Sequence, residues 1–213
     1  MQLWSATLST YSTKVRIVCA EKRIAVTILE LPWSRQTLYA KSKEFLAVSP
    51  RGEVPVLLDG DVVLFDSTVI NEYLEEKFPE PALMPRELVA RARCRLLEDQ
   101  ADHLVAAHLT TLVREVFLRP NQATRDQTAV DKAQTAFAAH HALLDATLEN
   151  APYLCGEFTL ADIANFVVLA FGRTLGAAID TKHSRLTAWL ARVAERPTVK
   201  REFEAIRHKV SQA

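Results

Sequence analysis

The sequence has few of the residues that mark several common functional classes. Its five glycines form neither a G-x-G-x-x-G pattern nor a P-loop, so the usual nucleotide-binding signatures are absent. Its three cysteines, Cys19, Cys94 and Cys155, are too few and too far apart for a disulfide framework, which favours a reducing cytoplasm. His140 and His141 are adjacent and point to different faces, and no Cys/His pairs have ligand spacing, so no metal site is expected.

Charge of one sign and long hydrophobic runs are also lacking. Lys plus Arg number 26 and Asp plus Glu number 26, so the formal net charge is zero. A balanced chain offers no broad basic surface for nucleic acid or for an anionic membrane. No apolar run approaches the roughly 18 residues that span a bilayer, and the start Met1–Ser5 lacks the basic and apolar regions of a signal peptide. We therefore expect no nucleic-acid partner and no membrane partner.

The chain does have the composition of a globular protein, with 49% hydrophobic and 24% charged residues. Its 213 residues suit one large domain or two small ones. The composition changes at a linker that contains Pro79, Pro81 and Pro85. We therefore expect two domains, residues 1–80 and residues 86–213.

The first eighty residues predict a small α/β domain. A strand over residues 3–8 is followed by a hydroxyl-rich start, Ser9 to Thr13, of an amphipathic helix and then by a β-branched strand over 25–29. Such a βαβ unit pairs its strands in parallel. A long connection leads to residues 54–58 and 62–65, which predict a hairpin with Asp59-Gly60 as its turn. Asp66-Ser67 then begins a second helix, which gives the order β-α-β followed by β-β-α.

The rest of the chain predicts helices alone. Apolar periodicity and proline breaks indicate helices near residues 86–117, 127–150, 159–175, 184–195 and 198–209. Thr159 and Asp162 are spaced as in a capping box that starts the third of these helices. The second domain is therefore expected to be an all-α bundle.

Three motifs in this order resemble the cytosolic glutathione transferases. The stretch Ser49–Leu57 is similar to that family's N-P-x-G-x-V-P-x-L segment, and Phe65–Ile70 is similar to its [ED]-S-x-A-I segment. Thr159–Asp162 matches the capping box of its C-terminal domain. The resemblance implies a thioredoxin-like N-terminal domain (β-α-β-β-α) plus an all-α C-terminal helical bundle. It also implies glutathione as a co-substrate and a homodimer.

The first helix resembles the serine-type classes of that family. Ser9–Val15 is similar to the S-x-x-x-x-[RK]-V start of the zeta, phi and theta classes, and Lys22 falls where the zeta and phi patterns place a lysine. Tyrosine-type classes carry a tyrosine at the end of the first strand, where this chain reads Leu3-Trp4-Ser5. The chain is thus similar to a serine-type bacterial member, with Ser9 as the catalytic residue. The alternative is that Ser9 only caps the helix.

The resemblance also implies a set of residues that bind glutathione. Val54 would pair its backbone with the cysteinyl unit next to a cis Pro55, and Ser67 would bind the γ-glutamyl carboxylate at a helix N-terminus. Asp66 would face the γ-glutamyl ammonium group. Lys41 would reach the glycyl carboxylate, or else lie in solvent as an ordinary loop lysine. Glu53 stands where glutamine is frequent in the family.

An electrophile pocket lies between the two domains in this family, and it should be apolar and lined by loops. The candidates for it are Tyr11, Trp33, His103, His108 and Arg173. Each also has an ordinary structural interpretation, such as loop packing for Trp33 or a favourable charge at a helix C-terminus for Arg173.

Three functions remain open at this point. The first is a glutathione transferase that acts on small hydrophobic electrophiles through a thiolate stabilised by Ser9. The second is a glutathione-dependent isomerase of the maleylacetoacetate type, or a dehalogenase. The third is a non-catalytic binding protein on the same fold, as in transcription and translation factors such as stringent starvation protein.

Overall fold

The computed structural model describes residues 1–34, 38–119 and 121–211. Contacts within the chain divide it into one unit of residues 1–83 with 196–213 and a second unit of residues 84–195. The sequence predicted a second domain of residues 86–213, whereas the second unit of the structure ends at residue 195. Helix α9 (Pro197–Ser211) belongs to the first unit, where its Glu202 pairs with Arg16 on α1 (Thr10–Glu21) at 2.6 Å.

The first unit is built on a four-stranded mixed sheet in the order β2-β1-β5-β6. The strands are β1 (Gln2–Ser5), β2 (Thr27–Glu30), β5 (Val56–Asp59) and β6 (Val62–Phe65). β1 pairs with β2 in parallel, which confirms the βαβ prediction, and it pairs with β5 in antiparallel orientation. Two short strands, β3 (Trp33–Ser34) and β4 (Leu38–Tyr39), pair separately.

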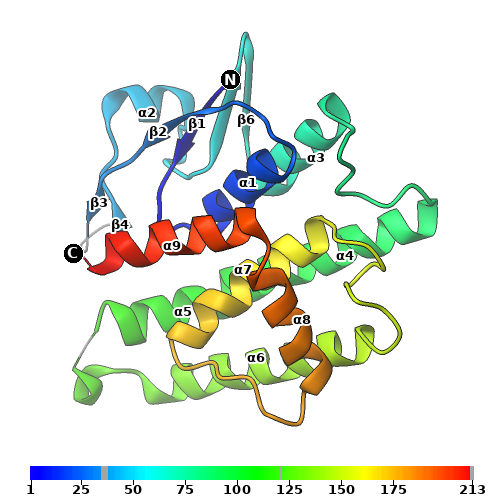
Figure 1. Cartoon of the computed structure of the whole chain (residues 1–213). Coiled ribbons are helices and arrows are strands. Elements are labelled where there is room, and N and C mark those ends of the chain that lie inside the picture. The colour runs from blue at the N-terminus through cyan, green and yellow to red at the C-terminus, as the bar shows by residue number, and fades with distance from the viewer. Residues whose placement is uncertain (35–37, 120, 212–213) are drawn as a thin grey trace. The chain divides into compact units, whose positions relative to one another are not determined.

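Helices cover both faces of this sheet. Because side chains alternate along a strand, Leu3 and Leu57 are buried on one face, while Trp4 and Val56 lie on the other. Figure 1 shows α1 beside α3 (Ser67–Lys77) on one side and α2 (Lys43–Val48) on the other. α2 was not expected from the sequence. It is only six residues long, and Phe45 alone is buried, packing against Trp4 with a ring separation of 5.6 Å.

Two local details differ from the sequence prediction. The first strand ends at Ser5 rather than near residue 8, because the chain turns over residues 6–9 to enter α1. The hairpin loop is Gly60-Asp61 rather than Asp59-Gly60, since Asp59 pairs with Val62 in the ladder. Gly60 has φ of 61°, a left-handed conformation that glycine adopts without steric cost and that a two-residue hairpin requires.

In the described residues of the second unit, the regular structure is helical and loops connect the helices. The exceptions are isolated β-bridges between residues 153 and 157. Its first helical run begins with α4 (Leu88–Leu104) and continues without a break to Phe117. It includes two π-helical stretches, Val105–Leu109 and Val113–Phe117, on either side of α5 (Thr110–Leu112). A 3-10 turn (Gln122–Thr124), α6 (Gln127–Thr147), α7 (Leu160–Thr174) and α8 (Ser184–Ala194) follow. The expected helical bundle is confirmed, and no described helix is long and apolar enough to cross a bilayer.

The predicted capping box at the start of α7 is present and buried. The Asp162 carboxylate accepts hydrogen bonds from the backbone N–H groups of Thr159 at 2.9 Å and Leu154 at 3.0 Å. It also accepts one from the Trp189 indole at 2.8 Å. Burial raises the pKa of Asp162, and these donors act in the opposite direction. One carboxylate therefore fixes the start of α7, the turn before it and α8 together.

In the first unit, a buried ion pair likewise joins several segments of the chain. Lys22, just after α1, lies 2.5 Å from Glu75 on α3, and its side chain is fully buried. Its Nζ also donates to the carbonyls of Phe78 and Pro81, at 2.7 and 2.9 Å. Glu75 in turn accepts from the N–H of Leu83. Lys22 thus connects the end of α1, α3 and the proline-rich linker.

Replacing Lys22 by methionine should destabilise the fold. Lys22→Met keeps the apolar stem but leaves the Glu75 carboxylate buried without its partner, which typically costs about 3 kcal/mol. Urea unfolding followed by circular dichroism measures the change. Lys77→Met is the matched control because the Lys77–Asp59 pair has an exposed lysine, and its loss should change stability far less. Equal effects of the two substitutions would contradict this account.

Candidate functional site

Three strand ends meet at one edge of the sheet in the first unit. Trp4 pairs with Val56, and Val56 pairs with Phe65. This register places the loop that follows β1 next to Val54-Pro55, the residues that precede β5. It also places Pro55 next to the start of α3, which follows β6. Ala6 and Val54 lie in one buried cluster, in agreement with this. Residues far apart in the sequence thus form one candidate site.

Ser9 lies in the first of these three segments, as the N-cap of α1. Its backbone is extended, with φ of −84° and ψ of 117°, and its Oγ accepts a hydrogen bond from the N–H of Ser12 at 3.2 Å. The side chain is half-buried. Accepting that bond leaves the Ser9 hydroxyl hydrogen available to donate to an anion. The position at a helix N-terminus adds the partial positive charge of the helix.

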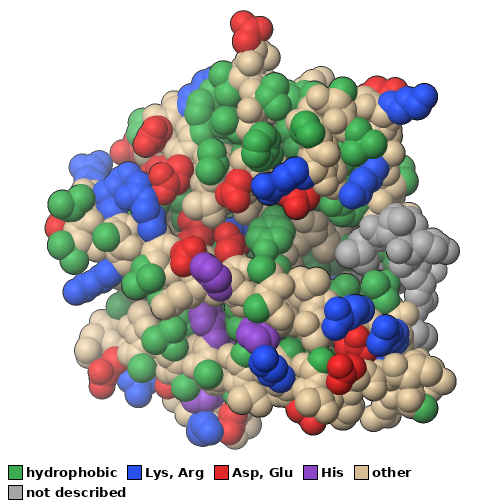
Figure 2. Space-filling model, turned by 180° about the vertical axis from the view of Figure 1, so that it is seen from behind, with side chains coloured by type: hydrophobic (Ala, Val, Ile, Leu, Met, Phe, Trp, Pro, Cys, Tyr) green, Lys and Arg blue, Asp and Glu red, His purple; other side chains and the backbone are tan. Residues whose placement is uncertain are grey.

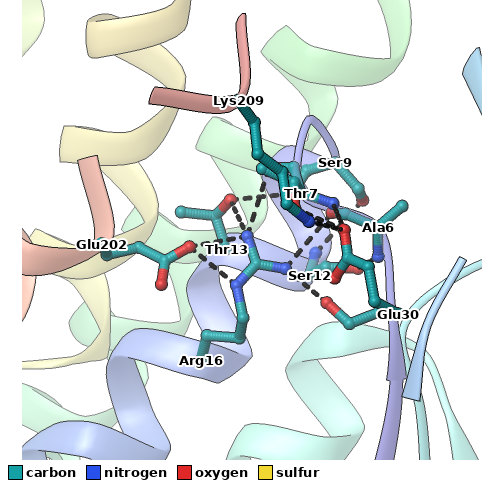
Figure 3. Close-up of polar contacts among 10 residues, drawn as sticks. Ala6, Thr7, Ser9, Ser12, Thr13, Arg16, Glu30, Glu202 and Lys209 are labelled. Carbon is teal, nitrogen blue, oxygen red and sulfur yellow. Dashed lines mark hydrogen bonds and ion pairs between the residues drawn. The ribbon is translucent and has the colours of Figure 1, made fainter. Parts of the chain in front are cut away.

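Arg16 holds the loop that carries Ser9, as Figure 3 shows. Its guanidinium donates to the carbonyls of Ala6 and Thr7, each at 3.2 Å. It also donates to the hydroxyls of Ser5 and Thr13, the latter at 2.9 Å. A planar guanidinium with five fixed donors suits such a set of acceptors better than a lysine would. One side chain of α1 therefore sets the path of the chain from β1 to Ser9.

Helix α9 completes this network from the far end of the sequence. Glu202 accepts from Arg16 Nε at 2.7 Å and lies 2.6 Å from Nη2, which orients the guanidinium. Lys209 donates to Thr7 Oγ1 at 2.7 Å and to Glu30 at 2.9 Å, and Glu30 accepts from the Thr7 N–H at 2.8 Å. The sequence analysis missed these four charged residues. Arg16 follows directly on the motif Ser9–Val15, but nothing in the sequence indicates its partner 186 positions away.

The second segment of the site surrounds the Val54–Pro55 peptide, which is cis, as the resemblance implied. Both residues are buried. Glu53, the residue before Val54, is held by Ser49. Ser49 Oγ accepts from the Glu53 N–H at 3.0 Å and donates to the Glu53 carbonyl at 2.9 Å, which fixes the turn. The Tyr39 hydroxyl donates to the Gly52 carbonyl at 3.1 Å. Burial, followed by the nearby Glu53 carboxylate, raises the pKa of Tyr39.

The side chain of Lys41 lies against this turn. A Cβ atom at Gly52 would come within 2.8 Å of Lys41 Nζ, so glycine is required for the lysine to pack there. Gly52 also has φ of 64°, which disfavours other residues. The Glu53 side chain points to solvent and pairs with Arg51 at 2.6 Å, with both side chains more than half exposed. The Glu53 carboxylate thus has a neighbouring positive charge.

The third segment is the start of α3. Asp66 has φ of 77°, and its carboxylate accepts from the N–H groups of Thr68 and Val69, at 2.9 and 3.2 Å. It therefore caps its own helix. Ser67 is buried, with 3% of its surface exposed. The two residues present a carboxylate, a hydroxyl and a helix N-terminus at one place, where an amino acid head group could bind.

The predicted pocket residues fall into both units. In the first unit, Tyr11 is half-buried with Lys14 Nζ 5.7 Å from its ring centroid, and Trp33 lies opposite Tyr39 in the small β3–β4 pair. The others belong to the second unit: His108 is half-buried in the first π-helical stretch, while Arg173 at the end of α7 and His103 on α4 are exposed. A common pocket stays a prediction. The described residues contain no cluster of three or more potential metal ligands.

Comparison with known families agrees with this geometry. Residues 3–82 match the glutathione S-transferase N-terminal domain, and residues 101–197 match the glutathione S-transferase C-terminal domain. The chain belongs to the cytosolic glutathione S-transferase family. Glutathione S-transferase 3 of Zea mays is 29% identical over 212 residues, covering 97% of this chain and 94% of that protein.

Two other relatives extend the comparison. A glutathione S-transferase from Rhodospirillum rubrum F11 has a solved structure similar to this chain, with a TM-score of 0.82 and 28% identity over 94% of this chain and 90% of that one. A stringent starvation protein A homolog of Coxiella burnetii is 45% identical over 97 residues. That match covers 46% of this chain and 44% of the Coxiella protein, less than half of each.

Removing the Arg16 guanidinium should loosen the Ser9 loop. In Arg16→Met the Ala6 and Thr7 carbonyls lose their donors, so we expect amide hydrogen exchange over residues 6–12 to accelerate about tenfold or more. Mass spectrometry of deuterated peptides measures this. Arg201→Met is the control because Arg201 is exposed on α9 next to Glu202. Unchanged exchange in Arg16→Met would show that the loop is held by other contacts.

Proposed function

We propose that the chain is a glutathione transferase in which the Ser9 hydroxyl stabilises the thiolate of bound glutathione for attack on small hydrophobic electrophiles. One observation carries the proposal. Ser9, at the N-terminus of α1, shares one sheet edge with Val54-Pro55 and with the start of α3. A reducing compartment such as the cytoplasm suits this chemistry because glutathione is kept mainly as the thiol there.

The energy required is within reach of these groups. A free thiol has a pKa of about 8.5 and is only slightly ionised at neutral pH. Lowering the pKa by about two units requires about 2.7 kcal/mol of preferential anion stabilisation. A hydrogen bond from a hydroxyl to an anion and the N-terminus of α1 each supply part of this. Ser9 acts as a donor in this mechanism and forms no covalent bond to the substrate.

The remaining site residues would hold the tripeptide. The Val54 backbone, next to the cis Pro55, would pair with the cysteinyl unit. Ser67 and the N-terminus of α3 would bind the γ-glutamyl carboxylate, and Asp66 its ammonium group. Lys41, packed on Gly52, would reach the glycyl carboxylate. Arg51 offsets the charge of Glu53 near this anionic ligand.

The electrophile would bind among Tyr11, Trp33, His108 and Arg173. Conjugation of a hydrophobic electrophile is the main proposal. A glutathione-dependent isomerase or dehalogenase uses the same thiolate, and Arg173 would then bind a substrate carboxylate. Comparing a maleyl-type diacid, a haloacid and an aryl halide as substrates distinguishes these reactions.

A homodimer is also part of the proposal. The first unit exposes large apolar side chains on β6 and α3, and hydrophobic side chains gather below the projecting hairpin tip in the upper part of Figure 2. They include Val63 at 45% exposed, Phe65 at 51% and Val69 at 51%. Exposed apolar groups of this kind mark interaction surfaces. A second copy of the chain is the partner that the family favours.

Removing the Ser9 hydroxyl tests the mechanism. In Ser9→Ala the pKa of the bound glutathione thiol should rise by about one unit or more, and kcat/KM with an aryl halide should fall about tenfold to a hundredfold at neutral pH. Ultraviolet titration of the thiolate in the complex measures the first quantity, and a conjugation assay measures the second.

Ser42→Ala is a close control for the loss of a helix cap. Ser42 caps α2 as Ser9 caps α1, with its Oγ accepting from the N–H of Phe45 at the same distance, 3.2 Å. Both variants should lose about 1 kcal/mol of stability. Only Ser9→Ala should change the thiol pKa and the rate. If neither quantity changes in Ser9→Ala, Ser9 is a structural cap and the mechanism is wrong.

A second candidate is a non-catalytic protein on the same fold. The 45% identity to a stringent starvation protein A homolog over 97 residues favours it. The two candidates differ in their affinity for glutathione. Calorimetry with millimolar glutathione should give a binding isotherm for an enzyme, and Ser67→Ala should weaken that binding. The absence of heat in the wild-type chain would favour the non-catalytic function.

A further inference from the structure

Arg16 and Glu202 form an enclosed ion pair between α1 and α9. One carboxylate oxygen of Glu202 accepts from Arg16 Nε at 2.7 Å and lies 2.6 Å from Nη2. The two side chains are only 10% and 16% exposed, so solvent and salt screen the pair weakly. A guanidinium held at two of its nitrogens has a fixed orientation, and its remaining N–H groups therefore point to fixed places.

Those N–H groups reach both backbone groups of Ser9, each through one intermediate (Figure 3). Arg16 Nη1 donates to the Ala6 carbonyl at 3.2 Å, and the same oxygen accepts from the Ser9 N–H at 3.0 Å. Arg16 Nη2 donates to Thr13 Oγ1 at 2.9 Å, and that hydroxyl donates to the Ser9 carbonyl at 2.9 Å. The peptide groups on both sides of Ser9 are thus tied to one guanidinium.

The direction of the Ser9 hydroxyl depends on this backbone. Ser9 is extended at the N-cap of α1, and its Oγ accepts from the Ser12 N–H at 3.2 Å. A hydrogen bond weakens steeply when its donor moves out of line with the acceptor. Loosening the chain on either side of Ser9 would therefore weaken a bond from its hydroxyl to a bound sulfur.

We propose that Arg16 is a positioning residue for Ser9, and that Glu202 of the last helix, by orienting Arg16, sets how strongly Ser9 stabilises the bound thiolate. The inference rests on the proposed function and adds the residues that support its donor. Neither side chain has to touch glutathione. Arg16 acts through Ala6 and Thr13, and Glu202 acts through Arg16.

The charge of Glu202 by itself would have the opposite effect. A nearby anion raises the pKa of a thiol, so removing a carboxylate that acted only through its field would lower the pKa of bound glutathione. Removing a carboxylate that orients Arg16 should instead raise it, because the Ser9 hydroxyl is then held less well. The other charged groups at this loop, Glu30 and Lys209, bond to each other and to Thr7 and are unchanged in such a variant. The direction of the shift therefore distinguishes positioning from charge.

The test compares Glu202→Ala with Glu204→Ala, which removes the same charge from an exposed position of α9. In Glu202→Ala the pKa of the bound thiol should rise by about half a unit. The kcat/KM for an aryl halide should then fall about threefold on the acid side of the pH profile and approach the wild-type value at high pH. Glu204→Ala should change neither quantity.

A measurement without glutathione accompanies these assays. Amide hydrogen exchange over residues 6–12 should accelerate in Glu202→Ala and stay unchanged in Glu204→Ala. Arg16→Lys provides a second variant if Glu202→Ala does not fold. It keeps the positive charge, but one ammonium group cannot replace the planar set of donors that reaches Ala6 and Thr13. It should therefore also raise the pKa of the bound thiol.

A double-mutant cycle tests whether Glu202 acts through Ser9. Adding Glu202→Ala to Ser9→Ala should give no further rise in the thiol pKa, because the hydroxyl that it positions is already gone. A further rise in that background would overturn the proposal, as would an unchanged or lower pKa in Glu202→Ala alone. Where Glu202→Ala does not fold, an unchanged pKa in Arg16→Lys would overturn it.

The Ser9→Ala variant separates this failure from failure of the proposed function. If Ser9→Ala raises the thiol pKa and Glu202→Ala does not, Ser9 stabilises the thiolate and only the positioning role is wrong. If Ser9→Ala leaves the thiol pKa unchanged, the proposed mechanism is wrong and the positioning role is wrong with it.

Discussion

The pairing of β1 with β5 and of β5 with β6 is the constraint on which the candidate site depends. Their register places the loop after β1, the cis Val54–Pro55 peptide and the start of α3 at one edge of the sheet. A slip of one residue in either pairing would turn side chains to the opposite face. The packing of the partly buried Trp4 and the buried Val56 around Phe45 on α2 opposes such a slip.

Charged residues then shape the loop at that edge. Arg16 bonds the Ala6 and Thr7 carbonyls, and Glu202 on α9 orients the guanidinium. The last helix of the chain thus stabilises the segment that carries Ser9, although almost the whole sequence separates them. Family membership and this geometry are the grounds for the proposal that Ser9 stabilises a thiolate.

Several features could be predicted from the sequence because they depend on local patterns. The parallel βαβ unit follows from strand and helix periodicity over thirty residues, and the Thr159–Asp162 capping box follows from a spacing of three. Other features could not. α2 has only six residues and one buried side chain, too few to show a period. The hairpin loop shifted by one residue because ladder pairing of Asp59 with Val62 outweighed the Asp-Gly preference.

The sequence by itself determined the family and the order of the main elements, β-α-β followed by β-β-α and then helices. It also supplied the candidate residues Ser9, Val54 and Ser67, since short motifs carry them. The tertiary structure alone decided that Arg16 pairs with Glu202 and that Lys22 is buried against Glu75. The physical reason is that hydrogen bonds and ion pairs between distant segments depend on how the elements pack. No local pattern of residues encodes that packing.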